Sequence, residues 1–166
     1  MKAGGVKVVY DGLEKFKEAM KALSSIDVLV GIPEQKTERN DEENTPITNA
    51  AIGYINENGS DLNNIPPRPH LVPGVQKVSK EVADEFKKAA QKAFSNPGAV
   101  LQHYTRAGII ASNSVKEVIQ SQDGFQEISD ATKQARENNN FKGDKALIVT
   151  GQYRNAITYV IDEGKK

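Results

Sequence analysis

The sequence predicts an α+β fold in which a small, mostly antiparallel sheet packs against a long α-helical hairpin. Two long stretches with apolar residues at helical spacing, separated by Ser95-Asn96-Pro97, predict the hairpin. Three short runs of β-branched or alternating apolar residues predict the strands. Residues 34–46 and 121–145 are polar without apolar periodicity, which predicts flexible loops. We expect a single domain over residues 1–166, because the chain shows no internal repeat and no linker.

The strands are expected near Val6–Tyr10, Ile26–Ile32 and Ile157–Ile161. Asp11 is the expected N-cap of a helix after the first strand, and Ser24-Ser25 is its expected end. The apolar stripe of this helix consists of Leu13, Phe16, Met20 and Leu23. Pro33 ends the second strand, since proline cannot donate to a sheet.

The expected hairpin consists of helices over Val75–Phe94 and Val100–Gln120. Pro73 suits the first turn of one helix, and Asn96 and Pro97 suit the cap and first position of the other. The apolar face of the first helix is Val75, Val78, Val82, Phe86, Ala89 and Ala93. That of the second is Val100, Tyr104, Ala107, Ala111, Val115 and Val118. Short helices are expected at Thr48–Asn58, Asp130–Arg136 and after Thr150.

Composition excludes several classes of protein. Lysine plus arginine and aspartate plus glutamate both number 22, whereas proteins that bind nucleic acid as their main role usually carry a basic excess. The absence of cysteine removes disulfides, thiolate nucleophiles and cysteine-based zinc sites. No apolar run approaches the ~20 residues that span a bilayer, and the N-terminus lacks a signal-peptide pattern. We therefore expect synthesis in a cytoplasm and no membrane association.

Motifs for catalysis, cofactors or metals are missing from the sequence. His70 and His103 are expected on different elements, with His103 on the polar side of its helix, which is a weak metal signal. Asp41-Glu42-Glu43 lacks the spacing of a calcium loop and is interpreted as solvated. No phosphate-binding loop, nucleophile elbow or His-Glu-x-x-His helix occurs. We expect no enzyme activity, no cofactor and no metal.

Two segments are candidate partner interfaces. Three prolines in Ile65–Leu71 hold the chain extended and rigid. This segment is either a connector or an arm that presents Arg68 and His70 to a neighbour, with Arg68 suited to an acidic partner. The second segment, Thr150–Asn155, is either a turn that satisfies its own backbone, which the spacing favours, or a recognition turn. The candidate interface residues are Ile65, Pro66, Pro67, Arg68, Pro69 and His70, with Gln152, Tyr153 and Arg154.

These two segments carry a resemblance to the virion-morphogenesis proteins of tailed bacteriophages, a group that overlaps tail-completion and neck proteins. Residues 51–59, followed by Ile65-Pro66-Pro67-Arg68-Pro69, resemble the family's Ala/Ile-rich helix, Glu-x-Gly step and Ile-Pro-x-Arg-Pro-Phe-Leu-Arg. Residues 128–133 with Arg136, followed by residues 147–159, resemble its Ser-x-x-Thr and Leu-Ile-Asp-Thr-Gly-x-Leu-x-x-Ser-Ile block. The departures from the pattern include four positions: His70 replaces phenylalanine, Val72 arginine, Val149 aspartate and Tyr153 leucine.

The resemblance implies a structural protein of the virion that forms a homo-oligomeric ring at the head–tail junction, in the neck or at the top of the tail. Its partners would be other copies of itself, neighbouring neck or connector proteins, and tail-tube or tail-terminator proteins. Genome DNA would pass through the ring without sequence-specific binding. Two alternatives remain open, a DNA-binding accessory protein and another non-enzymatic interaction module, while a small hydrolase finds no support in the motifs.

Overall fold

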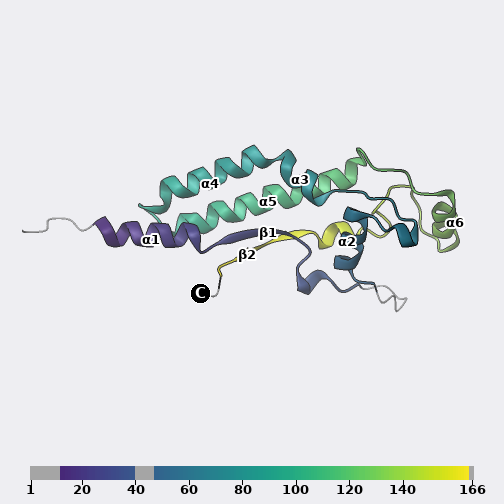
Figure 1. Cartoon of the computed structure of the whole chain (residues 1–166), viewed down its shortest axis with the longest axis horizontal. Helices are drawn as coiled ribbons and strands as arrows, with labels where there is room; N and C mark the ends of the chain where they lie inside the picture. Colours follow the sequence, from purple (N-terminus) through teal and green to yellow (C-terminus); the bar gives the residue numbers. More distant parts are fainter. Residues whose placement is uncertain (1–11, 40–46, 165–166) are drawn as a thin grey trace, which may run out of the picture.

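The computed structural model describes residues 12–39 and 47–164. The molecule is elongated along the direction of its longest helices (Figure 1). Its helices are α1 (Gly12–Ser24), α2 (Asn49–Asn58), α3 (Leu71–Lys77), α4 (Ser79–Ala93), α5 (Gly98–Ser121), α6 (Asp130–Asn138) and α7 (Gln152–Ala156). Two 3-10 turns lie at Glu34–Lys36 and Asp61–Asn63, and the strands are β1 (Asp27–Gly31) and β2 (Thr158–Asp162). None of the helices in these two ranges is both long and apolar enough for a membrane crossing.

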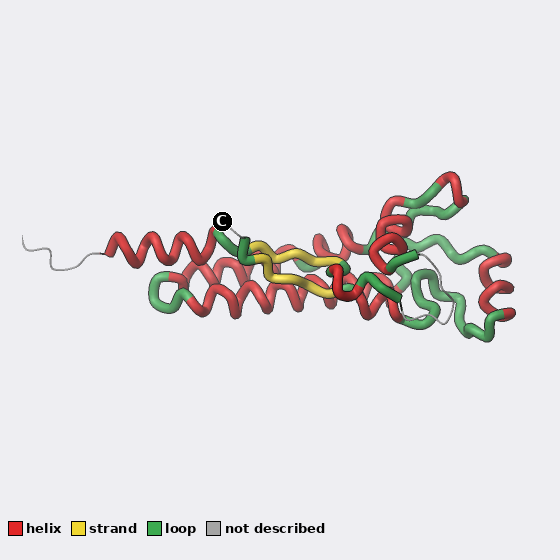
Figure 2. The backbone as a smooth tube through the Cα atoms, turned by 90° about the horizontal axis from the view of Figure 1, so that it is seen from below, coloured by secondary structure: helices red, strands yellow, loops and turns green. Residues whose placement is uncertain are grey.

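The hairpin of α4 and α5 is the scaffold, and a two-stranded antiparallel sheet lies along α5 (Figures 1 and 2). β1 pairs with β2 from Asp27 opposite Asp162 to Gly31 opposite Thr158. The α+β class and the helical hairpin packed against an antiparallel sheet are therefore confirmed, as are the second and third expected strands. The expected strand Val6–Tyr10 and the Asp11 cap lie outside the described residues.

The core consists of two apolar clusters, one toward each end of α5. The cluster at the hairpin tip joins α1, α4, α5 and the sheet through Ala19, Ala89, Ala93, Val100 and Tyr104. The other joins α5 to α7 and the start of β2 through Val115, Ile119, Tyr153 and Ile157. Between them Gly108 lets the sheet approach α5, since a Cβ there would lie 2.5 Å from the ring of Tyr159. Alanine and glycine thus occupy many of the core positions at which other proteins have larger apolar residues.

The first arm of the hairpin is broken at Val78, so the expectation of one helix over Val75–Phe94 was wrong. The Ser114 hydroxyl donates to the Gly74 carbonyl at 2.7 Å. In a continuous helix that carbonyl would accept the N–H of Val78, which here bonds to Val75 instead. Gly74 also packs directly on Val115, where a Cβ would lie 2.6 Å from its Cα. A tertiary hydrogen bond therefore redirects the chain.

Other boundaries follow the sequence with small shifts. α2 begins one residue later than expected, with Thr48 as its N-cap, and ends before Gly59, whose φ of 78° favours glycine. At the start of α5, Asn96 accepts the Ala99 N–H through its backbone carbonyl and not through its side chain. Ile119, and not the half-buried Val118, completes the buried stripe of α5.

The α1 stripe is the main apolar feature left on the surface. Leu13, Phe16 and Met20 are 57%, 47% and 46% exposed, and Phe94 at the hairpin tip is 53% exposed. The rings of Phe16 and Phe94 lie 5.9 Å apart. We call these four residues the tip patch. Only the C-terminal part of α1, with Ala19 and Leu23, contributes to the core.

Candidate partner interface

The two candidate interface segments meet inside the protein at the end of the molecule opposite the tip patch (Figure 1). Nε2 of His70, in the extended arm, is hydrogen-bonded to the Tyr153 hydroxyl on α7, 83 residues away in sequence. The two rings pack edge to face with centroids 5.5 Å apart. Both side chains are buried. The arm and the turn are therefore parts of one structural unit.

His70 is a neutral ring whose tautomer is fixed by its neighbours. Nδ1 lies 2.7 Å from the Arg68 carbonyl, which can only accept, so Nδ1 carries the proton. Nε2 then accepts the Tyr153 hydroxyl proton. Burial lowers the pKa of His70, although the Arg68 carbonyl and the Glu57 carboxylate act in the opposite direction. The 3.1 Å approach of Nδ1 to Glu57 is therefore a contact of a neutral ring and not an ion pair.

Glu57, at the end of α2, holds the arm where it enters α3. Its carboxylate accepts the backbone N–H groups of His70, Leu71 and Val72 at 2.8, 2.9 and 3.1 Å. These are N–H groups that the start of a helix leaves without a partner. Burial alone would raise the pKa of Glu57, but the three backbone donors hold it below its usual value. A charged side chain from α2 thus caps α3.

Tyr153 fits against α2 because residue 53 has no side chain. A Cβ on Gly53 would lie 3.0 Å from the Tyr153 hydroxyl oxygen and 3.3 Å from the ring. Burial, with the nearby charge of Glu57, raises the pKa of Tyr153 well above its usual value, so the hydroxyl keeps its proton. α2, the arm and α7 are therefore joined by direct contact around one phenol.

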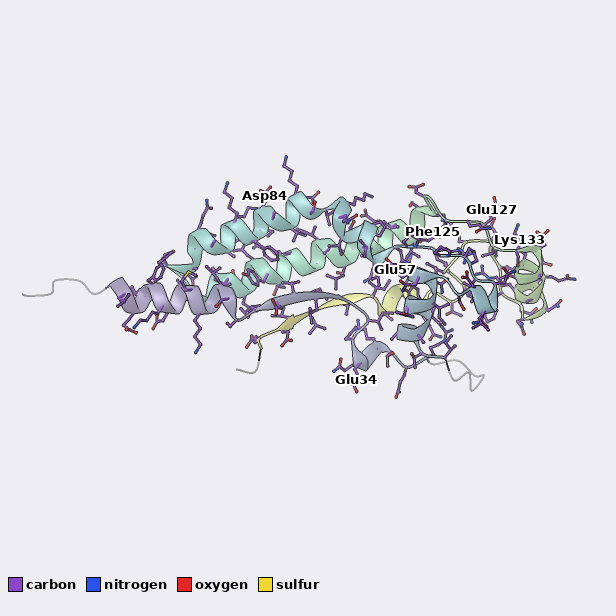
Figure 3. All side chains as sticks on the ribbon, viewed as in Figure 1. Glu34, Glu57, Asp84, Phe125, Glu127 and Lys133 are labelled. Atoms are coloured by element: carbon purple, nitrogen blue, oxygen red, sulfur yellow. The ribbon has the colours of Figure 1, made fainter. Side chains whose placement is uncertain are left out.

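Arg68 also points inward. It is 7% exposed, its Nε donates to the Gln126 carbonyl at 3.1 Å and its Nη2 to the Glu127 carbonyl at 3.4 Å. Its backbone N–H donates to the Asn56 carbonyl. Arg68 thus ties the arm to α2 and to residues 126–127 at the far end of the molecule, where Figure 3 labels Glu127. The partners that Arg68 has here are carbonyls of its own chain.

The remaining candidate residues differ in their exposure to solvent. In the arm Pro67 and Pro69 are exposed and alternate with the buried Arg68 and His70, as an extended chain requires. Ile65 and Pro66 are half-buried. In the turn, Gln152 is half-buried and the Arg154 guanidinium donates to the Gln120 side chain. The arm is therefore both connector and surface, and its proline side faces outward.

Beside this unit lies a cleft of about 1170 Å³. It runs between the arm, α2, α6 and the segment that leads to α7, and its lining includes Ile52, Pro66, Arg68, Ile128, Ser129, Thr132, Arg136, Leu147 and Tyr153. The Gln122 amide holds one wall, since it accepts the Ala146 N–H at 2.7 Å and donates to the Ala146 carbonyl at 3.0 Å. Arg136 directs Nη1 to the carbonyls of Gly143, Lys145 and Ile148 at 3.0, 3.0 and 3.4 Å. Hydrogen bonds from side chains therefore hold the walls of the cleft, although the sequence of residues 121–145 is polar and has no apolar periodicity.

A second polar cluster lies within the hairpin, and it corrects the expectation that His103 sits on the polar side of its helix. His103 is 3% exposed, and its Nδ1 lies 2.7 Å from a Glu85 carboxylate oxygen. The other oxygen bonds Lys88 at 2.5 Å. Hydrogen bonds from His103 and Lys88 lower the pKa of Glu85 from 4.5 to about 2. The cluster joins α4 to α5.

The sequence analysis treated the arm and the turn as two separate segments and did not pair them. It also gave no weight to Glu57, Gln122 and Arg136, whose roles depend on backbone groups distant in sequence. Across residues 12–39 and 47–164, no group of three or more histidine or acidic side chains is placed to hold a metal ion. Comparison with known proteins gave no match, neither to a protein-family model nor to a curated protein or a solved structure.

Proposed function

We propose that this chain is a non-enzymatic structural protein of a tailed bacteriophage, one subunit of a ring that joins the head to the tail. Its role is contact. Each subunit binds its neighbours in the ring and the adjoining neck, connector or tail proteins, while genome DNA passes through without being read. Sites of this kind need shaped surfaces on a stable scaffold and no reacting groups.

The observation that carries the proposal is the contact between His70 and Tyr153. The two blocks that resemble the virion-morphogenesis family lie far apart in sequence, yet they meet at this one buried pair. His70 and Tyr153 are also two of the positions that depart from the family pattern, where phenylalanine and leucine are usual. A hydrogen-bonded polar pair therefore stands where the pattern has an apolar pair. Two departures that compensate each other support a true resemblance over two chance matches.

The distribution of surfaces also suits a ring. A closed ring needs a heterologous contact, in which one surface of a subunit meets a different surface of the next. The tip patch lies at one end of the molecule, and the cleft with the outward prolines of the arm lies at the other (Figure 1). Aromatic residues with half of their surface exposed, such as Phe16 and Phe94, are typical of protein interfaces. The two ends thus offer two different surfaces to neighbours.

The decisive experiment uses the phage that encodes the chain. We expect mass spectrometry of purified virions to detect this polypeptide. Deletion of its gene should leave full heads and separate tails in electron micrographs, and the wild-type chain supplied in trans should restore joined particles. Joined, infectious particles that lack the polypeptide would contradict the proposal.

A variant of the tip patch makes the test specific. Phe16→Ser should reduce incorporation into virions while leaving the melting temperature within a few degrees, because Phe16 is already half exposed. Ile109→Ser on α5, at a side chain 43% exposed and outside the patch, is the matched control and should be incorporated normally. Salt-sensitive DNA binding by the purified protein, with normal assembly of both variants, would favour the accessory-protein alternative.

A further inference from the structure

Three arginines line the cleft, and for two of them, Arg68 and Arg136, no carboxylate of the described residues lies within ion-pair distance. Arg68 bonds the carbonyls of residues 126 and 127, and Arg136 bonds three carbonyls of residues 143–148. These acceptors carry no net charge. The ion pairs among the described residues involve lysines and histidines, and neither Arg68 nor Arg136 takes part in one. The cleft therefore holds two cationic groups that form no ion pair with the described residues, although Asp61 and Glu127 also line it and the charge of Asp144 acts on Arg136.

Part of each guanidinium is available to a ligand. A guanidinium carries five N–H groups, and those on Arg68 Nη1 and on Arg136 Nε and Nη2 form none of the bonds described above. Every fully buried polar side-chain atom among the described residues has a hydrogen-bond partner. Since these nitrogens have none, they are not fully buried, and both residues line the cleft. Burial lowers the pKa of Arg136, with Asp144 acting against this and the charge of Arg68 adding to it. The two cations are thus near enough to interact.

The rest of the lining is mixed: Asn56, Asp61 and Glu127 are among its polar residues, and its apolar residues suit side chains of a polypeptide. Ile52, Ile128 and Leu147 line the cleft together with the two arginines. Nucleic acid is a poorer match, because phosphate backbones are followed by rows of exposed cations, whereas Arg68 is 7% exposed and the whole chain has a formal net charge of zero. Two guanidinium forks in a partly apolar cleft match a single planar carboxylate.

We propose that the cleft binds an internal peptide segment of a partner protein that carries one aspartate or glutamate side chain flanked by apolar residues. The carboxylate lies between Arg68 and Arg136, and the apolar side chains pack against Ile52, Ile128 and Leu147. This inference deepens the proposed function, on which it rests for the identity of the partner, a neighbouring protein of the head–tail junction. The chemistry of the bound segment rests on the cleft alone.

The test uses the purified full chain as bait for a displayed library of random nonapeptides. Each nonapeptide is flanked on both sides by further polypeptide, so that it is presented as an internal segment. We expect the selected peptides to share an acidic residue between apolar ones. One of them is then synthesised with its acidic residue and with the matching amide. Binding of the amide peptide, measured by fluorescence anisotropy, should be weaker by about tenfold or more, because a charge-assisted bond is lost. The change is made in the peptide, so the folding of the protein cannot explain the result.

Protein variants locate the site. Arg136→Lys keeps the charge but loses the fork, and we expect about tenfold weaker binding of the acidic peptide. Arg106→Lys, at an exposed position on α5 outside the cleft, is the control and should bind like the wild type. Melting curves establish that both variants are folded. The proposal is overturned if acidic residues are not enriched, if the amide peptide binds equally well, or if both variants bind equally.

Two further outcomes overturn the proposal in favour of another ligand. A requirement for a free C-terminal carboxylate would replace the internal segment with a chain end. Displacement of the peptide by a single-stranded oligonucleotide that binds more tightly would identify a nucleic-acid site. Failure of this inference is distinguishable from failure of the proposed function, because peptide binding is measured on the purified protein and incorporation is measured on virions.

Discussion

The contact between His70 and Tyr153 gives the sharpest test of the structure and of the resemblance together. We consider the substitutions His70→Phe and Tyr153→Leu, which restore the two residues that the phage family pattern carries. Each single change leaves one polar group buried without its partner: the Tyr153 hydroxyl in the first case and Nε2 of His70 in the second. The double change removes both groups and replaces the polar pair with an apolar one.

The expected magnitudes follow from burial. Leaving a buried donor or acceptor without a partner costs about 1–3 kcal/mol. Tyr153→Leu also loses ring volume, and His70→Phe also leaves the Arg68 carbonyl without the Nδ1 donor. Both of these added costs remain in the double variant, whereas the cost of the orphaned partner does not. Both orphaned groups are absent from the double variant, so we expect it to be more stable than the sum of the two single changes predicts, by about 2–6 kcal/mol.

Urea unfolding followed by circular dichroism at pH 7 measures the four free energies of unfolding. The control cycle combines His70→Phe with Tyr104→Leu, a tyrosine in the other core cluster whose hydroxyl bonds the Leu23 carbonyl. Distant sites should be additive within about 0.5 kcal/mol. If the His70 and Tyr153 changes are equally additive, the buried pair does not exist as described. The two departures at these positions then give no support to the resemblance.

Three further predictions concern single residues. Glu57→Gln should lower the free energy of unfolding by about 2 kcal/mol at pH 7, because an amide offers one acceptor oxygen where the carboxylate serves three N–H groups. The control is Glu117→Gln, at an exposed residue, which should change the free energy by less than about 0.5 kcal/mol in the same urea titration. Gly108→Ala should cost about 1–3 kcal/mol by thermal unfolding, because its Cβ would overlap the ring of Tyr159; an unchanged melting temperature would show that the sheet can retreat from α5. The pKa of Glu85 is lowered to about 2, so its contribution to the free energy of unfolding is present above pH 4.5 and is lost as the pH falls toward 2. Between these pH values the wild type should therefore lose more stability than Glu85→Gln. Parallel curves of stability against pH would contradict the assignment.

The elements that the sequence predicts well are those fixed by local chemistry. The apolar repeat along α5 and the end of α2 at Asn58 depend on residues within a few positions of each other. The same holds for the β-branched run in β1 and for the short helix that begins at Asp130. In these places propensity and pattern agree with the tertiary structure, so a single sequence is sufficient.

The features that escape prediction depend on partners distant in sequence. The break at Val78 arises because Ser114 takes the Gly74 carbonyl, and no local signal marks that bond. His103 reads as polar on its own helix and becomes buried because Glu85 faces it from α4. The periodicity of one element indicates which residues share a face, but not which charged group the neighbouring element brings to it.

The arm is an extended segment whose two sides face different surroundings. An extended chain sends alternate side chains to opposite sides, so Arg68 and His70 bond the protein interior while Pro67 and Pro69 face outward. Replacing Arg68 therefore breaks two hydrogen bonds to residues 126–127 before any partner is involved, and the loss of assembly that followed would be ambiguous. Arg136 likewise bonds three carbonyls of its own chain, so docking on this end of the molecule is best tested from the partner's side. The prolines contribute by limiting the chain to the one conformation in which both sides can act at once.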